Sequence, residues 1–433
     1  MIAPFFRCRS RHGAPPAEPY LQGLLSQMPR QNMERMGELL PDTRHEDLQH
    51  FLSDSPWDTG PVWRWVGQRA SAHLGGRADS MLRIDESGFA KKGDRSVGVA
   101  RQYHGRLGKT DNCQVGVFAV LALGPRATLV GARLFLPDGW VEDPARCRRA
   151  GVPEPEIRAR TKLEWARALV AEAQAHGLQF QWVGADTFYG RDQGWLCELA
   201  GQGLGFLVDV PCDTRVWTQA PPSGARPAVL DASGAERVDA VGRQWSRGGK
   251  GQQVTLRVGE NGPVAVRLWA QRVWGWPPAE PRPRRWWLLV REDARGERKF
   301  SLSNAPAQTS LRRLGRLQGQ RHFIERTLED GKSQVGMGQH QARKWRAWQH
   351  HMALVGLALL FVLEERLGRQ EPQPLLSVRD VVERLDWYFR GSRSAREVEA
   401  AVRRRHQRRA RLAAAALARA KKRDRKAQVK IPK

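Results

Sequence analysis

Two aspartates stand directly after short apolar segments of the kind that form strands. Asp85 follows Met81–Ile84, and Asp186 follows Phe180–Ala185. Side chains at the carboxyl ends of strands in such sheets project into a common crevice, where two carboxylates repel each other unless a cation neutralises them. Carboxylate oxygens are hard ligands that suit Mg²⁺ or Mn²⁺. The two acids therefore predict a divalent-metal site, although a single aspartate after a strand is more often an ordinary loop or helix-cap residue.

A third acid, Glu325, lies between Arg321 and Lys332 in a helical pattern that runs from Leu311 to Val335. At 100° per residue, both of these basic residues fall within about 40° of Glu325 on the helix surface. A metal-binding carboxylate between two cations suits a phosphodiester, because the metal activates the attacking oxygen while the cations hold adjacent phosphates. Two alternatives stay open: a solvated helix with salt bridges between turns, and Glu329, one turn later, as the third acid.

The elements that must position these acids follow from the periodicity of residues 81–210. Three apolar runs are followed by a capped helix, a strand, a short helix and a last strand. The order β-β-β-α-β-α-β predicts an α/β fold with a mixed sheet and helices packed on it. The segments are Met81–Ile84, Gln114–Leu123, Ala127–Leu136, the helix that starts at the capping box Thr161–Glu164, Phe180–Ala185, Asp192–Ala200 and Leu204–Val210.

The rest of the chain divides by composition into segments that predict further domains. A helical N-terminal segment fits either DNA binding or simple support, and a Gly- and Pro-rich stretch with short alternating runs predicts a β-rich insertion. The predicted divisions are a disordered segment 1–20, a helical domain 21–76, the first part of a core 77–210, a β-rich insertion 211–307, the last part of the core with helices 308–390, and a basic tail 391–433.

The charge balance indicates a polyanionic partner. The chain of 433 residues carries a formal net charge of +27. The tail after residue 390 holds 16 basic and 3 acidic residues, so about half of the excess lies outside it. Such a balance favours nucleic acid first and an anionic membrane second. A metal site for phosphodiester chemistry would have no use at a membrane, so nucleic acid is the preferred partner.

Other patterns exclude several kinds of site. The five cysteines stand far apart without a C-x-x-C pair, which argues against a disulfide framework and a zinc ribbon. The sequence starts without an apolar signal segment. The longest apolar run, Met352–Leu363, is too short to span a bilayer and predicts a buried helix. Arg247–Gly251 lacks the spacing of a phosphate-binding loop, and His350–His351 lacks that of a zinc protease. We expect a soluble cytoplasmic protein.

Several motifs resemble those of DDE transposases from bacterial insertion sequences, and most closely the family that transposon catalogues number seven hundred and one. The resemblance covers most of the chain from about residue 20 to 410. The residues that carry it are Asp85–Gly93, Ser96–Tyr103, Gly108–Lys109, Asn112–Val115, Trp140–Asp143, Arg146–Pro153, Ala185–Asp186, Tyr189–Gly190, Ile324–Glu325, Lys332, Arg343–Trp345 and His350–Met352.

This resemblance implies a ribonuclease-H-like catalytic core with a β-rich insertion before the helix that bears the last acid. Asp85, Asp186 and Glu325 are similar to the two aspartates and the glutamate that bind two Mg²⁺ (or Mn²⁺) ions. Because Glu86 lies next to Asp85, it stays open which of these two acids binds metal. The wider group carries a Tyr-Arg-Glu-Lys signature, whose tyrosine position is occupied here by Gln318.

By the same resemblance, the substrates are double-stranded DNA of the terminal inverted repeats and of the target. The reaction is cut-and-paste transposition, and joining two ends implies a homodimer on DNA. The alternatives are an inactive DNA-binding repressor derived from a transposase and a metal-dependent nuclease on the same fold. The basic residues expected to contact DNA are Arg321, Lys332, Lys91, Lys92, Arg101, Arg404, Arg405 and Arg408.

Overall fold

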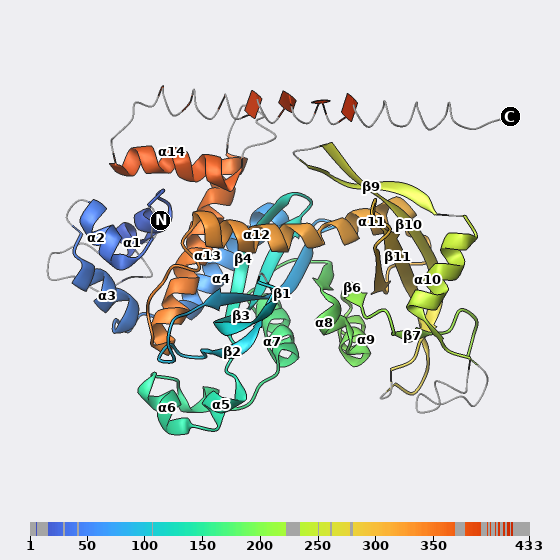
Figure 1. Ribbon diagram of the computed structural model, residues 1–433, viewed down its shortest axis with the longest axis horizontal. Coiled ribbons are helices and arrows are strands. Elements are labelled where there is room, and N and C mark those ends of the chain that lie inside the picture. The colour runs from blue at the N-terminus through green and yellow to red at the C-terminus, as the bar shows by residue number, and fades with distance from the viewer. Residues whose placement is uncertain are drawn as a thin grey trace. The chain divides into compact units, whose positions relative to one another are not determined.

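The computed structural model describes Phe6, residues 16–390 with gaps at 29–30, 41–42, 106, 222–233, 250, 260–261, 278–279 and 369–376, and scattered residues between 396 and 418. The chain forms two compact units (Figure 1). One comprises Met1–Phe180 with Phe323–Arg403, and the other comprises Gln181–His322 with Arg404–Lys433.

The first unit begins with four helices: α1 (Ala17–Leu24), α2 (Met33–Leu39), α3 (His45–Ser53) and α4 (Thr59–Leu74). Short polar side chains start two of them, because they satisfy amide groups that lack partners within the helix. The Asn32 side chain accepts from Arg35 N–H, and the Asp58 side chain accepts from Gly60 N–H, each at 3.0 Å. Helix α1 starts inside the segment 1–20 that we expected to be disordered; residues 1–5 and 7–15 lie outside the described part.

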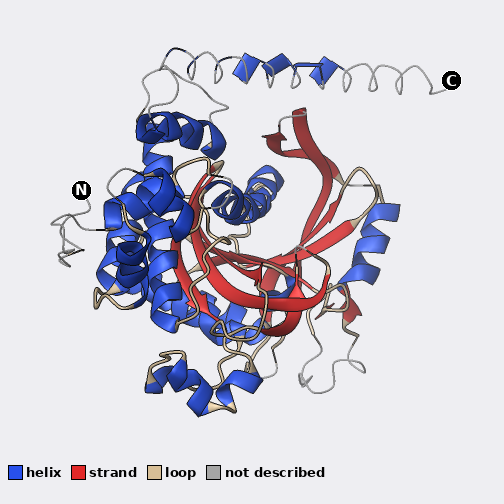
Figure 2. Ribbon diagram, turned by 60° about the vertical axis from the view of Figure 1, so that its left-hand side comes forward, coloured by secondary structure: helices blue, strands red, loops and turns tan. Residues whose placement is uncertain are grey.

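Helices α1, α3 and α4 contact a long apolar helix, α13 (Trp345–Leu367), and α2 contacts α1 and α3. Figure 2 shows a group of helices near the N-terminus. Two adjacent histidines of α13 form hydrogen bonds to α1, to α3 and to the segment after α3. Both nitrogens of the His350 ring lie 2.9 Å from backbone carbonyls, those of Leu52 and Trp57. His351 Nδ1 lies 2.8 Å from the hydroxyl of Tyr20. The N-terminal helices therefore share one core with α13.

Helix α13 is long and apolar enough to cross a membrane by length and composition. However, 83% of its most apolar window is buried inside the protein. This burial is what we expected from the apolar run within it, and it identifies α13 as a core helix. After α13, the described part continues with α14 (Val378–Arg390), which contacts α13.

The sheet of the first unit has four antiparallel strands: β1 (Met81–Ala90), β2 (Ala100–His104), β3 (Lys109–Leu123) and β4 (Arg126–Leu134). Strand β1 pairs along one edge of β3, and β2 and β4 pair along the other. Beyond β4 come two short helices, a 3₁₀ turn and the capped helix α7: α5 (Asp138–Val141), α6 (Pro144–Arg149), η1 (Glu154–Glu156) and α7 (Lys162–Ala175).

Helices cover both faces of this sheet. A side chain at Gly116 of β3 would meet Trp348 of α13 at 3.1 Å, and one at Gly131 of β4 would meet Leu169 of α7 at 2.9 Å. Gly131 pairs with Ala119, which is three residues from Gly116 and therefore faces the opposite side of β3. The sheet thus lies between α7 and α13, as the mixed α/β prediction requires.

The second unit contains a six-stranded mixed sheet in the order β5-β6-β12-β11-β10-β9. Only β5 and β6 are parallel, and the remaining pairs are antiparallel. The strands are β5 (Trp182–Ala185), β6 (Gly205–Val210), β9 (Gln252–Gly259), β10 (Gly262–Gly275), β11 (Arg284–Glu292) and β12 (Arg298–Ser303), with a separate small pair formed by β7 (Arg215–Val216) and β8 (Glu236–Arg237).

The described part of the second unit also contains the helices α8 (Thr187–Gly190), α9 (Gln193–Gly201), α10 (Val238–Arg247) and α11 (Leu311–Gly319). Helices α8 and α9 connect the parallel strands β5 and β6. Helix α10 packs on the sheet at Gly242, where an added side chain would meet Phe300 and Val290. Helix α11 contacts β9 and β10.

Three sequence expectations about elements were wrong in detail. Strand β1 does not end at Ile84 but pairs with β3 as far as Ala90, because backbone pairing continues where the side chains become polar. Strand β2 and helix α10 were not expected. The helical pattern Leu311–Val335 forms two helices, since α11 ends at Gly319 and α12 (Arg321–Gln334) starts after it.

Candidate active site

The first acid, Asp85, lies in the middle of β1, opposite Phe118 of β3. Side chains alternate along a strand, so Asp85 shares a face of β1 with Ser87 and Phe89. Its Oδ1 atom accepts a hydrogen bond of 2.8 Å from the backbone N–H of Glu86. Asp85 is half-buried, and the antiparallel pairing of β1 with β3 continues on both sides of it along the strand.

Lys332 of α12 lies against the same face of β1. Its Nζ atom donates to Ser87 Oγ at 2.5 Å and to the carbonyl of Gly88 at 3.0 Å, and it lies 5.1 Å from the centre of the Phe89 ring. Ser87 and Phe89 point to the side where Asp85 also points. These contacts join α12 to the face of β1 that carries Asp85.

Glu325 lies on the same side of α12 as Lys332. Seven residues separate the two, which is close to two full turns and a rotation of about 20°. Glu325 is exposed, whereas Ile324 and Leu328, at about 100° and 60° from it around the helix axis, are buried. Glu329 is also exposed and lies about 40° from Glu325 around the axis. The structure therefore leaves both glutamates available to the third-acid role.

The neighbouring acid Glu86 points to the other face of β1. Its Oε1 atom forms an ion pair of 2.9 Å with Lys162 Nζ, at the start of α7. Both side chains are largely shielded from solvent. Lys162 neutralises Glu86 directly, and sequence reasoning missed this lysine because nothing in its spacing pointed to Glu86.

Asp186 comes directly after β5 in the second unit and begins α8. Its Oδ1 atom accepts a hydrogen bond of 2.9 Å from the backbone N–H of Phe188, so one of its oxygens acts as a helix cap. The short helix approaches β6 closely: a side chain at Gly190 would come within 1.9 Å of the carbonyl of Asp209. Asp186 is thus held between the end of β5 and the start of α8.

Arg321 starts α12 in the second unit and forms an ion pair with Asp209 of β6. Asp209 is buried, with 4% of its surface exposed. Its other oxygen accepts a hydrogen bond of 2.5 Å from Ser301 Oγ. Sequence reasoning missed Asp209; the signal was an aspartate inside the apolar strand Leu204–Val210.

The remaining predicted DNA-contacting residues differ in exposure. Lys91 is half-buried, its Nζ donates to the carbonyl of His340 at 2.6 Å, and burial lowers its pKa to about 8. Lys92 and Arg101 are exposed. Arg404, Arg405 and Arg408 lie outside the described residues.

The donor set suits a hard cation, because all three predicted ligands offer carboxylate oxygens. Asp85 and Glu325 belong to the first unit and Asp186 to the second. Within the described residues, no three His, Cys, Asp or Glu side chains form a group that could hold a metal ion. The three-carboxylate site therefore stays a prediction.

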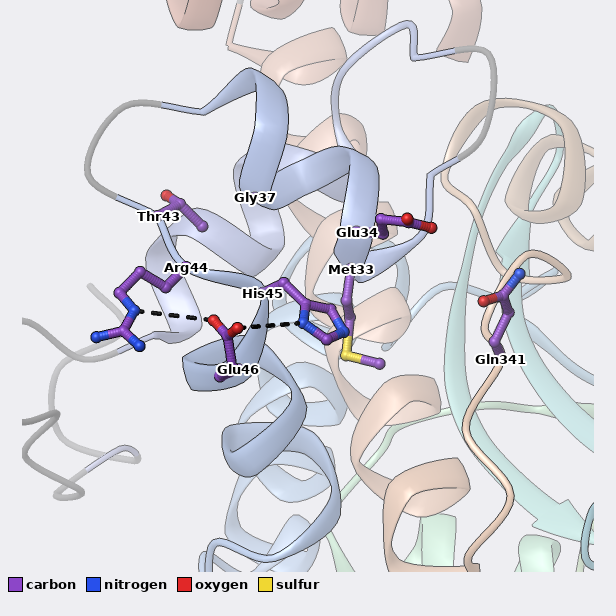
Figure 3. A pocket seen from close by; sticks show the side chains of 8 residues that line it. All are labelled: Met33, Glu34, Gly37, Thr43, Arg44, His45, Glu46 and Gln341. Carbon is purple, nitrogen blue, oxygen red and sulfur yellow. Dashed lines mark ion pairs between the residues drawn. The ribbon is translucent and has the colours of Figure 1, made fainter.

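A cavity of about 530 Å³ lies beside the N-terminal helices of the first unit (Figure 3). The lining residues come from α2, α3 and the segment before α3, together with Gln341. Glu46 lies there between Arg44 Nε at 3.8 Å and His45 Nδ1 at 4.0 Å. None of the predicted metal ligands or DNA-contacting residues lines it.

Comparison with known proteins gives two matches. A family model described as DDE superfamily endonuclease matches residues 4–263. The protein named "Probable transposase for insertion sequence element IS701", from Microchaete diplosiphon, is 32% identical over 189 residues, which are 43% of this chain and 46% of that protein. The similarity thus spans a little less than half the length of the relative. Asp85 and Asp186 both fall within the segment that the family model covers.

Proposed function

The chain belongs to the DDE superfamily of endonucleases, and from that membership we propose that it is a DNA transposase. It cleaves the phosphodiesters at the ends of a mobile element and joins the freed 3′-hydroxyls to target DNA. The similarity to a probable insertion-sequence transposase supports this assignment.

One structural observation carries the proposal. Lys332 binds Ser87 and Gly88 on the strand that bears Asp85, and Glu325 lies two turns away on the side of α12 that Lys332 occupies. This contact aligns an acid-bearing strand with an acid-bearing helix through a basic residue. An arrangement of carboxylates with nearby cations suits a polyanionic substrate.

Asp85 and Asp186 would hold two Mg²⁺ (or Mn²⁺) ions, and Glu325 would complete one of the two sites. When bound, the ions activate the attacking oxygen and neutralise charge at the leaving oxygen. The chain itself orients the ligands, since backbone N–H groups of Glu86 and Phe188 each fix one oxygen of an aspartate. The same acids would serve water in cleavage and a DNA hydroxyl in joining, because both are in-line displacements at phosphorus.

The DNA would be held by exposed cations around this site. Lys92 and Arg101 lie on the segment that follows β1, and the basic tail would add affinity independent of sequence. Two element ends must be joined, so we propose a homodimer on the terminal inverted repeats, acting on cytoplasmic nucleoid DNA.

The test uses the full chain with duplex DNA taken from the sequence that flanks its reading frame. Asp85→Asn, Asp186→Asn and Glu325→Gln are each expected to abolish Mg²⁺-dependent cleavage while duplex binding is retained. Wild-type cleavage by all three variants would refute the acid assignment. Cleavage by Glu325→Gln together with loss of cleavage in Glu329→Gln would assign the third-acid role to Glu329, one turn later. Specific binding without any cleavage by the wild type would instead identify a repressor.

A further inference from the structure

The outer part of the β2–β3 hairpin, in the first unit, is a two-stranded ribbon. Strand β2 pairs with residues 109–113 of β3, whereas β1 pairs with β3 only from Cys113 onwards and β4 only from Gly116. Among the described strands, residues 109–112 of β3 therefore pair with β2 alone. A two-stranded hairpin is marginally stable by itself, so contacts with the rest of the unit must hold it in place.

The inner face of this ribbon is fixed to the protein. Gln102 and His104 lie on that face, because they are two residues apart on β2. His104 is buried, with 4% of its surface exposed, and a side chain at Gly88 of β1 would meet its ring at 3.0 Å. Gln102 Nε2 donates to the carbonyl of Gly98 at 3.2 Å. The ribbon is thus anchored to β1 at a point three residues from Asp85.

The outer face of the ribbon is open to solvent. Arg101 and Tyr103 lie on it, and Thr110, which pairs with Tyr103, is exposed as well. The acid of the hairpin, Asp111, belongs to the inner face, where its Oδ2 lies 3.6 Å from Lys109 Nζ. Among the described residues of the hairpin, the outer face therefore offers a guanidinium, a phenol and a hydroxyl group without a carboxylate.

Exposed apolar side chains gather on this hairpin. Among the described residues, the large apolar side chains that are exposed are Tyr103, Leu107, Phe188, Tyr388 and Leu417. Two of these lie within five consecutive residues of the hairpin, and 64% of the Tyr103 surface is exposed. Single exposed apolar residues are ordinary, whereas a tyrosine grouped with an arginine is typical of binding surfaces.

Charge favours nucleic acid over a second copy of the chain as the partner of this face. The sequence of residues 100–113 contains Arg101, Arg106 and Lys109 against the single acid Asp111. Strand β2 is an edge of its sheet, and edge strands can pair with another chain. However, a charged side chain on an edge strand opposes such pairing, and Arg101 is one. An excess of cations suits the phosphates of DNA instead.

We propose that the outer face of the β2–β3 ribbon lies in the major groove of duplex DNA, with Arg101 on a phosphate and Tyr103 against the base edges. The major groove, about 12 Å wide, admits a two-stranded ribbon, whereas the minor groove of undistorted DNA, at about 6 Å, is too narrow. Because the ribbon is anchored before DNA binds, little conformational entropy is lost on binding. This inference rests on the proposed function, and it adds Tyr103, for which the sequence predicted no role.

The test measures binding of the full chain to duplex DNA from the sequence that flanks its reading frame, with no divalent cation present. Arg101→Gln should lower the logarithmic salt slope by about 0.9, because one phosphate contact is lost. Tyr103→Ala should weaken binding by more than about 5-fold, the effect of removing an interface anchor, and should leave the salt slope unchanged.

Two matched variants control for the loss of an exposed side chain of the same type. Arg126→Gln changes an exposed arginine at the far end of β3, in the turn to β4. Tyr388→Ala changes a tyrosine of α14 that has 65% of its surface exposed. Both controls should bind the duplex like the wild type. Wild-type affinity of Tyr103→Ala, or an unchanged salt slope in Arg101→Gln, would overturn the proposal.

Methylation of guanine N7, which lies in the major groove, then tests the groove assignment. Some methylated guanines should block binding of the wild type and no longer block that of Tyr103→Ala. An identical interference pattern for the two proteins would overturn the placement in the major groove. If Tyr103→Ala changes self-association in sedimentation equilibrium and leaves DNA affinity intact, the face is a contact between protein copies and the proposal is wrong.

Binding is measured apart from cleavage, so the two proposals fail separately. A wild type that binds the duplex but never cleaves it with Mg²⁺ would refute the transposase assignment, and the binding variants would still decide the role of the ribbon. Cleavage by the wild type together with wild-type affinity of Tyr103→Ala would refute the ribbon alone.

Discussion

Glu86 Oε1 lies 2.9 Å from Lys162 Nζ, on the face of β1 opposite to the one that Asp85 shares with Ser87. Adjacent acids on one strand thus have separate environments. Glu86 is neutralised by a lysine of α7, while Asp85 shares its face with the residues that α12 contacts. Successive side chains of a strand point to opposite faces of the sheet, so Asp85 and Glu86 contact different parts of the protein.

The first prediction separates these two acids. Asp85→Asn should reduce Mg²⁺-dependent cleavage by more than about 100-fold, because loss of a metal ligand exceeds the 10- to 100-fold typical of residues that support ligands. Glu86→Gln should cost less than about 10-fold by the same reasoning, since it removes only a partner of Lys162. Single-turnover cleavage rates measure both effects. The reverse order of the two losses would assign the metal to Glu86.

The second prediction concerns the contact between α12 and β1. Lys332→Met removes hydrogen bonds from a charged donor to Ser87 and Gly88, and it should lower the free energy of unfolding by about 1.5–3 kcal/mol. Ser87→Ala should cost about 1 kcal/mol, and the double variant should cost less than the sum. Urea unfolding provides the measurement. Ser333→Ala is the control on the same helix, because Ser333 Oγ donates to the carbonyl of Glu329 and accepts from Gln334 Nε2, and both partners belong to α12. Additive losses would mean that Lys332 is not held by Ser87.

The third prediction is a pH dependence from His351, which is fully buried in α13. Its Nδ1 lies 2.8 Å from the Tyr20 hydroxyl and its Nε2 3.2 Å from the carbonyl of Met337, a pattern that suits the neutral ring. Burial lowers its pKa to about 3, with the charge of Lys91 adding to the effect. Between pH 6.5 and pH 3, His351 is therefore protonated in the unfolded chain and neutral in the folded protein.

The sign follows from that difference. Stability from His351 is complete above the unfolded pKa of about 6.5, and it is lost as the pH falls from there towards 3, by up to about 1.4 kcal/mol per pH unit. His351→Gln should remove this part of the slope between pH 6 and pH 4. Unfolding free energies of both proteins across that range test it. Equal slopes in the two proteins would show that His351 is already protonated when folded.

The fourth prediction concerns the loop after β1. Asn112 Nδ2 donates to the carbonyls of Lys91 at 2.7 Å and Gly93 at 2.8 Å, on either side of the exposed Lys92. If Lys92 contacts a phosphate, Lys92→Ala should lower the logarithmic salt slope of duplex binding by about 0.9. Asn112→Ala should weaken binding without changing that slope, because it loosens the loop and keeps the charge. Titrations at several salt concentrations distinguish the two, and an unchanged slope in Lys92→Ala would remove Lys92 from the interface.

The sequence predicted the mixed sheet well because apolar runs mark strands that are buried by helices on both sides. It placed Asp85 at a strand end, and the structure places it inside β1. Hydrophobic periodicity reports burial, whereas strand length depends on backbone pairing, which continued through the half-buried residues from Asp85 to Gly88. For the same reason β2, with an exposed Arg101 and Tyr103, gave no signal.

Side-chain partners were the least predictable part of the candidate site. The angular spacing of Arg321, Glu325 and Lys332 on one helix was correct, but it carried no information on what each cation contacts. Asp209 and Ser87 come from strands more than 100 residues earlier in the chain. Only the folded chain brings them to α12, so the spacing of residues on that helix could not show that Arg321 pairs with Asp209 or that Lys332 contacts Ser87.

The pairing of β12 with β6 sets a limit on how this protein can be shortened. Phe300 pairs with Val210 and Ser303 with Leu207, so the β-rich segment continues the sheet that begins with β5 and β6. Excising that segment would turn β6 into an open edge strand, with unpaired amide and carbonyl groups that favour aggregation. It would also remove Ser301, which bonds to Asp209. The β-rich segment is thus a structural part of its unit, and a minimal version of the protein has to keep it.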